Sequence, residues 1–496
     1  MHAMPATLRP VIAPRTPVRG RPATATLLLL ALVAVSVAAR LPLLGGAQID
    51  YDEGVYWASL RSMAAGHPLF SSVYSSQPPG FLSILAVFFG AGHSLTAARA
   101  GVLFFFAVAL VATYAAARTL LGPWPALAAA ALLAVDPLML RQSVTLQADG
   151  PSLALGMVAL ACAAAAAVSM PAGGGGLRSW RGSLLLVASG LALAVAVLVK
   201  LNAVAFAVPV GLVAVLAPGG EQPSLLTAVR RLQLVLAGAV LGAVVVLAPF
   251  ADRLPQVWSQ SVGSHLTARS LQEGGLTRDM ALALARESPF YLAGLIGLAV
   301  LLWRAPRLGA ILAAWGAAVA VLTVTQRPLW PHHLLVAAPL VVIAAAAPAA
   351  LAWRRISPRA LTGGSIAGLL CLGIAGLASG LVALDDAFTA DTHPDAVAAL
   401  RSLTRPGDLV VGDDQFAVAA ADRDAPPELV DTAFVRLDSQ HVTAADVEAI
   451  IVRDGVRAVY LATHRLDRLP GLVDWLRLHL PHVTRLDDGA IIYTAP

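Results

Sequence analysis

The segment Asp50-Tyr51-Asp52-Glu53 places three carboxylates just after the first hydrophobic run of the chain, Thr26 to Leu44. Only ten Asp and Glu residues precede residue 385, and three of them lie in these four positions. A carboxylate at the edge of a membrane is costly to bury, which makes it a candidate for function. Such a group can take a proton from a hydroxyl or hold a cation. The alternative is an acidic loop that simply faces water.

Most other ionisable side chains of the hydrophobic region fall on the same predicted side of the membrane as this cluster. A chain that gathers its few ionisable groups at one side is expected to build a site there. The set comprises Asp52, Glu53, Asp149, Lys200, His265, Arg269, Arg327, His332 and His333.

Several members of this set also have a purely structural interpretation. Asp149 precedes Gly150-Pro151 and could cap the helix that follows. Lys200, the single lysine, could extend its amine to the membrane interface. The pair His332-His333 begins a hydrophobic run, and adjacent histidines without further ligands are weak evidence for a metal.

The composition predicts a polytopic helical membrane protein. Hydrophobic residues make up 58% of the chain and charged residues 13%, against about 25% charged in soluble domains, and the mean hydropathy is +0.75. The net charge of +5 does not indicate nucleic acid, because the arginines are scattered between apolar runs. We expect an all-α bundle of about eleven spans. They are 25–44, 94–117, 124–140, 151–169, 182–200, 203–217, 231–250, 289–303, 308–325, 333–352 and 361–384.

Arginine placement predicts a cytoplasmic N-terminus by the positive-inside rule, with residues 1–24 as a disordered cytoplasmic lead and 25–384 as the membrane domain. The first outer loop, 45–93, contains helical apolar runs too short to cross, so interfacial helices are expected there. The outer loop 251–288 is polar with paired glycines, which favours a mobile lid. The localisation expected is the plasma (inner) membrane.

Residues 385–496 have a different composition and contain the other 19 acidic residues. Short β-rich runs alternate with amphipathic helical stretches, which predicts a small soluble α/β domain outside the cytoplasm. Strands are expected at 408–412, 456–461 and 490–493, helices at 394–403, 443–454 and 472–480, and 449–452 fits a strand or a helix end. Asp413-Asp414 follows a predicted strand, and strand ends often carry sites. The alternative, which is more typical of two adjacent acids, is a solvated turn.

Five motifs, in order and spacing, resemble the C-superfamily of membrane glycosyltransferases. More narrowly, they resemble the branch of glycosyltransferase family 39 that holds protein O-mannosyltransferases and lipid A aminoarabinose transferases. The resemblance covers roughly residues 25–355. The motifs are Asp52-Glu53-Gly54-Val55-Tyr56, Gln77-Pro78-Pro79-Gly80, Asp136-Pro137 with Leu146 to Pro151, Leu198-Val199-Lys200, and Trp330 to Leu335.

The resemblance implies an inverting transferase that moves a sugar from a polyprenyl-phosphate donor to a hydroxyl acceptor on the outer face. The acceptor would be a protein, a lipid or a cell-wall glycan, and no nucleic acid is implied. It further implies Asp52 as general base, Glu53 orienting the acceptor or a metal, and Asp149 supporting the acceptor or the sugar ring. Lys200 would face the leaving phosphate. Other substrate contacts implied are Tyr56, Gln77, His265, Arg269, Arg327, His332 and His333.

This chain departs from the branch at Gln77, where relatives commonly carry a charged residue beside Pro-Pro, so phosphate contact and metal dependence there are in doubt. No cofactor is required by the sequence, although a divalent metal held by Glu53, Asp149 or His265 is open. A second interpretation is a transporter or flippase for a lipid-linked or small polar solute. Such proteins usually contain internal repeats with broken helices near the bilayer midplane, which are not evident here.

Overall fold

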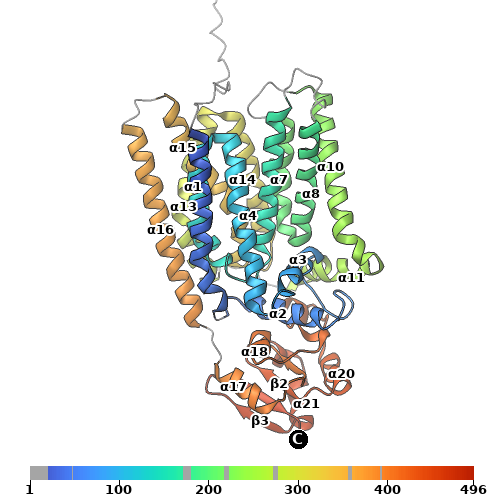
Figure 1. Ribbon diagram of the computed structural model, residues 1–496. Helices are drawn as coiled ribbons and strands as arrows, with labels where there is room; N and C mark the ends of the chain where they lie inside the picture. Colours follow the sequence, from blue (N-terminus) through green and yellow to red (C-terminus); the bar gives the residue numbers. More distant parts are fainter. Residues whose placement is uncertain are drawn as a thin grey trace, which may run out of the picture.

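The computed structural model describes residues 21–46, 48–170, 180–216, 223–271, 277–355, 360–390 and 394–496. A bundle of long helices forms one part of the molecule, and a smaller mixed α/β domain lies against one end of it (Figure 1). The chain is thus a mostly helical multi-span protein with a small C-terminal sheet, as the composition predicts.

Long helices account for most of the bundle. They are α1 (Arg21–Arg40), α4 (Leu95–Leu121), α7 (Asp149–Ser169), α8 (Trp180–Val199), α10 (Leu225–Leu247), α13 (Arg278–Arg304), α14 (Pro306–Thr325), α15 (Ala338–Arg355) and α16 (Ala360–Ala390). Shorter helices connect them: α2 (Tyr51–Ala64), α3 (Pro79–Phe89), α5 (Pro123–Val135), α6 (Pro137–Gln142), α9 (Ala207–Leu216), α11 (Leu254–Trp258) and α12 (Ser264–Leu271).

Nine helical stretches in the described part of the chain are long and apolar enough to cross a membrane, rather than the roughly eleven expected. The two expected spans that fall short are 124–140 and 203–217. Asp136-Pro137 ends the first, because proline disfavours helical geometry in the residue before it. The second consists of a 3-10 segment, Leu201–Phe206, followed by the ten residues of α9. Both are apolar helices of 10 to 17 residues.

Small residues allow neighbouring spans to approach closely. A Cβ placed at Gly190 of α8 would lie 1.8 Å from the Val235 carbonyl oxygen of α10, and one at Gly238 would lie 1.9 Å from the Val187 oxygen. Side chains at these positions would push the two helices apart. In a bilayer, where lipid tails are as apolar as leucine, such backbone contact supplies the packing energy.

Residues 45–93 form the two helices expected there, α2 and α3, which lie at the end of the bundle facing the C-terminal domain (Figure 1). The segment 251–288 is largely helical, containing α11, a π-helical turn at Ser259–Gly263, α12 and the first turns of α13. Residues 272–276, which include the paired glycines, lie outside the described part, and the lid role of the segment stays a prediction.

The C-terminal domain is built on a four-stranded mixed sheet in the order β1-β2-β4-β3. The strands are β1 (Val410–Gly412), β2 (Ala458–Leu461), β3 (His482–Arg485) and β4 (Ile491–Thr494), and only the β1–β2 pair is parallel. The helices are α17 (Pro394–Leu403), α18 (Gln415–Ala420), α19 (Phe434–Asp438), α20 (Ala444–Asp454) and α21 (Leu472–His479).

Strand alternation divides the core of this domain into two layers. Val411, Val459 and Tyr493 pack with residues of α20 and α21, such as Leu476, on one face. Residues whose side chains point to the opposite face of the sheet, including Tyr460, pack with α17 and α18. Helices therefore cover both faces of the sheet.

Residues 449–452, which fitted a strand or a helix end, belong to α20. Two details of this domain differ from expectation. β3 is an additional edge strand whose side chains show no apolar alternation. Asp413-Asp414 is not a solvated turn, since both residues are buried. Asp413 accepts hydrogen bonds from the backbone N–H groups of Ala462, Thr463 and Arg465, and Asp414 caps α18 by accepting the Phe416 N–H.

The domain docks on α2. Gly54 makes this possible, because a Cβ there would lie 2.3 Å from the backbone nitrogen of Phe416. Trp57 meets Phe416 edge to face, with ring centroids 5.5 Å apart. Arg61 extends the contact by pairing with Asp422 at 3.1 Å and Asp424 at 2.8 Å. The helix that carries the acidic cluster is thus held between the bundle and the C-terminal domain.

Candidate active site

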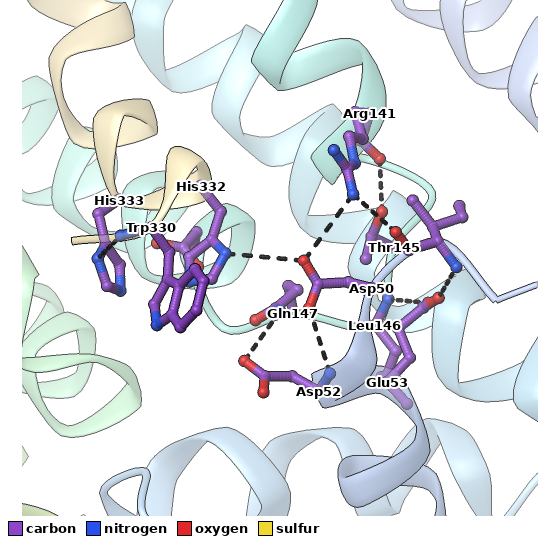
Figure 2. Close-up of polar contacts among 12 residues, drawn as sticks. Asp50, Asp52, Glu53, Arg141, Thr145, Leu146, Gln147, Trp330, His332 and His333 are labelled. Atoms are coloured by element: carbon purple, nitrogen blue, oxygen red, sulfur yellow. Dashed lines mark hydrogen bonds and ion pairs between the residues drawn. The ribbon is translucent and has the colours of Figure 1, made fainter. Parts of the chain in front are cut away.

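Asp50 begins α2 by accepting the backbone N–H of Asp52 at a distance of 3.2 Å. Aspartate is a preferred residue at this position because its carboxylate satisfies a helix donor that has no partner in the first turn. The start of α2 therefore fixes the directions of the acidic side chains, and Figure 2 shows them turning to different partners.

Glu53 is fully buried and fully engaged. Its two oxygens accept from Arg99 of α4 at 2.9 and 2.7 Å, and also from the backbone N–H groups of Ile49 and Leu146 at 2.7 Å each. Arg99 is itself buried completely. Such an ion pair is stable only because hydrogen bonds replace the lost hydration. Glu53 therefore ties three segments together: the start of α2, α4, and the loop before α7.

Asp50 faces the guanidinium of Arg141 and the imidazole of His332. Its Oδ2 lies 4.0 Å from Nη2 of Arg141 and 3.8 Å from Nδ1 of His332. Burial alone would raise the pKa of Asp50, but contact with His332 and the charges of His332 and Arg141 lower it to about 2. Arg141 also donates to the Ile49 carbonyl at 2.7 Å. Asp50 is consequently a permanent anion held in place from two sides.

Among the described residues, Asp52 differs from Asp50 and Glu53 because no cationic side chain contacts it directly. Its Oδ2 accepts from Nε2 of Gln147 at 3.2 Å. Burial raises the pKa of Asp52 to about 6, with the charge of Asp50 adding to the effect and those of His332 and Lys200 opposing it. A carboxylate with a pKa near 6 is ionised at neutral pH and still basic enough to accept a proton.

Asp149 and Lys200 form a buried ion pair, with Nζ of Lys200 2.6 Å from Oδ2 of Asp149. Asp149 is the first residue of α7, whose N-cap is Ala148 without a side-chain cap, so the capping interpretation does not hold. Lys200 is 6% exposed and follows the end of α8. The amine therefore points into the protein rather than to the interface. The charge of Lys200 also reaches Asp52, which places the two groups in one electrostatic cluster.

Asp136, from the third motif, has a structural task. It caps α6 by accepting the Met139 N–H at 2.9 Å. Glu287 of α13 accepts the neighbouring Leu138 N–H at 2.9 Å. Both carboxyls are buried. These two carboxyls hold α6 in place, and α6 contains Arg141, which lies beside Asp50.

The predicted histidines hold backbone and amide groups. Nε2 of His265 lies 3.0 Å from the Ser76 carbonyl, so α12 is connected to the Pro-Pro segment that precedes α3. Nδ1 of His333 accepts the Trp330 N–H at 3.1 Å, and its Nε2 lies 3.1 Å from Nε2 of Gln326. The rings of His332 and His333 meet edge to face at 4.4 Å.

The remaining predicted substrate contacts divide into two groups. Tyr56 is buried, meets Phe81 edge to face at 4.8 Å, and has its pKa raised by burial and by the charges of Asp52 and Asp149. Gln77 is half-buried, and its backbone is held by hydrogen bonds with the Ser75 hydroxyl. Arg327 is exposed. Arg269 belongs to α12, but its side chain lies outside the described part of the structure.

The residues proposed for a metal do not form a metal site. Glu53 is engaged by Arg99, Asp149 by Lys200, and His265 by the Ser76 carbonyl. Across the described residues, no group of three or more His, Cys, Asp or Glu side chains is arranged to hold a metal ion. No step of the chemistry below is assigned to a metal.

The structure adds residues that motif reasoning missed. Arg99 and Arg141 hold Glu53 and Asp50, and Gln147 is the hydrogen-bond partner of Asp52. Gln147 could have been found by its place inside the third motif. Arg141 had a weaker signal, a positive charge in a loop predicted to lie outside the cytoplasm. Nothing in the sequence pairs Arg99 with Glu53.

The C-terminal domain also contributes to the cluster. The Tyr51 hydroxyl lies 3.2 Å from Oγ1 of Thr432, and the Arg465 guanidinium lies 3.4 Å from the Tyr51 ring centroid. Asp431, the neighbour of Thr432, is buried and acts electrostatically on Tyr56 and His265. The polar cluster therefore has residues from the bundle on one side and from the C-terminal domain on the other.

Comparison with known proteins bears on this arrangement. Residues 76–251 match the dolichyl-phosphate-mannose-protein mannosyltransferase family. The chain is a polytopic membrane glycosyltransferase related to that family. The family resemblance predicted from the motifs is thereby confirmed, and with it the class of enzyme. No curated protein matches the chain in sequence.

Solved structures of membrane glycosyltransferases have the same fold. The chain is similar to ArnT from Cupriavidus metallidurans in the apo state, with a TM-score of 0.66 and 16% identity over 95% of this chain and 98% of that chain. The structure of ArnT bound to undecaprenyl phosphate gives the same TM-score and identity over 96% and 98%. The apo oligosaccharyltransferase of Archaeoglobus fulgidus matches with a TM-score of 0.61 and 14% identity, over 89% of this chain and 70% of that chain.

Proposed function

We propose that this glycosyltransferase moves a sugar from a polyprenyl phosphate to a hydroxyl acceptor with inversion at the anomeric carbon, on the outer face of the plasma membrane. The observation that carries the proposal is the contrast within the acidic cluster. Asp50 and Glu53 are paired with cations, whereas Asp52 contacts only an amide and keeps a pKa of about 6. A family match over 76–251 and ArnT bound to undecaprenyl phosphate support the choice of donor.

Asp52 acts as the general base. An alcohol is a weak nucleophile until its proton leaves, and a positioned carboxylate accelerates that transfer by about 10²–10⁴-fold. The acceptor oxygen bonds to the anomeric carbon as its proton passes to Asp52. The bond from that carbon to the phosphate oxygen breaks, and its electron pair leaves with the lipid phosphate.

Lys200 stabilises the leaving phosphate. Its amine already lies 2.6 Å from Asp149, yet an ammonium group has three donors and can contact a phosphate oxygen as well. Positive charge aimed at the departing group is the largest contribution that a site of this kind can make. Asp149 orients the amine, and its negative charge also favours the positive charge that develops on the sugar ring.

Glu53 is assigned a positioning role instead of contact with acceptor or metal, because both its oxygens are engaged within the protein. Its pairing with Arg99 sets the orientation of the first turn of α2, and hence the position of Asp52. His332 and Arg141 act through Asp50 in the same way.

The proposal is tested in proteoliposomes containing the purified full-length chain and a panel of undecaprenyl-phosphate sugars, mixed with a detergent extract of membranes from cells that encode the chain. Mass spectrometry should show loss of the lipid-linked sugar, formation of undecaprenyl phosphate and a glycosylated product of inverted anomer. A retained anomer would overturn the single-displacement mechanism. Movement of the lipid-linked sugar across the bilayer with no glycosidic product from any donor would favour the transport interpretation.

A further inference from the structure

Asp431 is a buried carboxylate in the soluble domain that the mechanism above does not use. It lies between the 3-10 turn Pro427–Leu429 and α19, and it is 2% exposed. Its Oδ1 accepts the Ala433 N–H at 2.9 Å, and its backbone oxygen accepts from Nη1 of Arg436 at 2.7 Å. Within the described residues, Oδ2 has no hydrogen-bond partner in the protein. This oxygen is not fully enclosed by protein atoms, so a hydroxyl group of a ligand can reach it and donate a hydrogen bond.

Cationic groups surround Asp431 without bonding to its carboxylate. Arg436 donates to the backbone oxygen and lies over the Tyr74 ring at 4.1 Å, and Arg465 lies over Tyr51. Burial raises the pKa of Asp431, and the charges of Arg436, His265 and Arg465 oppose that effect. Because the guanidinium groups of Arg436 and Arg465 already lie near the carboxylate, they would repel an incoming ammonium group, and the position is better suited to neutral hydroxyl groups than to an amine.

Asp431 is connected to the reacting groups through the wall between the domains. Its neighbour Thr432 contacts the Tyr51 hydroxyl at 3.2 Å, and Tyr51 precedes Asp52. Tyr56 lies within the electrostatic range of Asp52, Asp149 and Asp431 at once. α12, which carries His265, packs against α19, directly after Asp431. Asp431 therefore belongs to the same polar cluster as Asp52, but on the side of the soluble domain.

The two ends of the cluster suit different substrates. Lys200 and Asp149 lie at ends of membrane helices, where a lipid phosphate arrives from the bilayer. Asp431 belongs to the C-terminal domain. That domain lies beyond one end of the bundle, where an acceptor arrives from water (Figure 1). Resting on the proposed function, we propose that Asp431 binds the acceptor, its free carboxylate oxygen receiving hydrogen bonds from hydroxyls of a polyhydroxylated substrate next to the attacking one.

The test is to replace Asp431 by Asn and measure how transfer depends on acceptor. Asparagine keeps an oxygen for the Ala433 N–H but removes the charge, and hydrogen bonds to charged groups are worth about 1.5–3 kcal/mol. The probe is the detergent extract of membranes, diluted in steps at saturating undecaprenyl-phosphate sugar. The extract concentration that gives half the maximal transfer rate should be at least about tenfold higher for the variant than for the wild-type protein. The rate at saturating extract and the dependence on donor should change less than about twofold.

The matched control is Asp438→Asn, an exposed acidic residue of the same segment, which should leave both dependences unchanged. Asp431→Ser, whose hydroxyl can also accept the Ala433 N–H, repeats the test with a different side chain. An unchanged acceptor dependence in both Asp431 variants would overturn the inference while leaving the proposed function intact. If both variants lose the folded state, as judged by thermal unfolding, the residue is structural and the inference is likewise wrong. Absence of product from the wild-type protein would instead count against the proposed function.

Discussion

Two acidic clusters, Asp413-Asp414 and Asp50 to Glu53, lie at the starts of helices in this protein, and they are used in opposite ways. In the soluble domain, the oxygens of Asp413 accept three backbone N–H groups and Asp414 caps α18. At the membrane end, Asp50 caps α2 and faces a guanidinium, but Asp52 meets only the amide of Gln147. A carboxylate whose oxygens are satisfied by its own protein stabilises the fold. One that is left with weak partners retains a proton affinity that can serve chemistry.

The largest expected effect comes from Asp52→Asn. Loss of the general base should lower the transfer rate by about 10²–10⁴-fold. The free energy of unfolding should change by less than about 1 kcal/mol, since an amide can keep a hydrogen bond with Gln147. Transfer is measured in proteoliposomes and stability by chemical denaturation in detergent. Full activity in a properly folded variant would remove Asp52 from the mechanism.

Glu53→Gln should have the opposite profile, a large loss of stability. The substitution leaves the Arg99 guanidinium buried without its anion, which costs about 3–5 kcal/mol. Denaturation curves in detergent check this value. Adding Arg99→Met removes the stranded charge, so the double variant should regain part of the loss. Wild-type stability in Glu53→Gln would show that the ion pair does not hold the start of α2.

Asp413→Asn should destabilise the soluble domain by about 1–3 kcal/mol, because an amide nitrogen cannot accept the N–H groups that the carboxylate accepts. Asp474→Asn, which breaks only an exposed pair with Arg477, is the control and should cost less than about 1 kcal/mol. Thermal unfolding of both variants is the measurement. Equal losses of stability in the two variants would show that the hydrogen bonds of Asp413 do not stabilise the fold, and the contrast with Asp52 would no longer hold.

The smallest effect concerns pH. Asp52 must be ionised to accept a proton, so transfer should rise with pH through about 6 and level off above it. Asp50→Asn removes the neighbouring charge that raises the pKa of Asp52, and the acid limb should move to lower pH. Rates at saturating donor between pH 4.5 and about 8 give both profiles. An acid limb that stays in place or moves upward would contradict the assigned electrostatic coupling.

Prediction from sequence succeeded where the controlling pattern is local. Runs of apolar residues identified the long spans, and the helices of the soluble domain at 394–403 and 443–454 correspond to α17 and α20. The family motifs selected Asp52, Asp149 and Lys200 as site residues, and the structure places these three in one electrostatic cluster. Prediction from sequence failed at β3, whose residues have no apolar alternation, and at the buried Asp413, where an adjacent acid pair favoured a solvated turn. The roles of the individual site residues stay predictions until the variants are measured.

By itself the sequence determined that this chain crosses the membrane repeatedly, where its soluble domain begins to differ in composition, and which motifs it shares with polyprenyl-phosphate glycosyltransferases. Those properties follow from hydrophobicity and residue order along the chain. Only the tertiary structure decided that Glu53 is neutralised by Arg99, that Lys200 is paired with Asp149, and that Asp431 joins the cluster from the soluble domain. Burial and charge pairing depend on residues brought together from distant segments, and no local pattern records those distances.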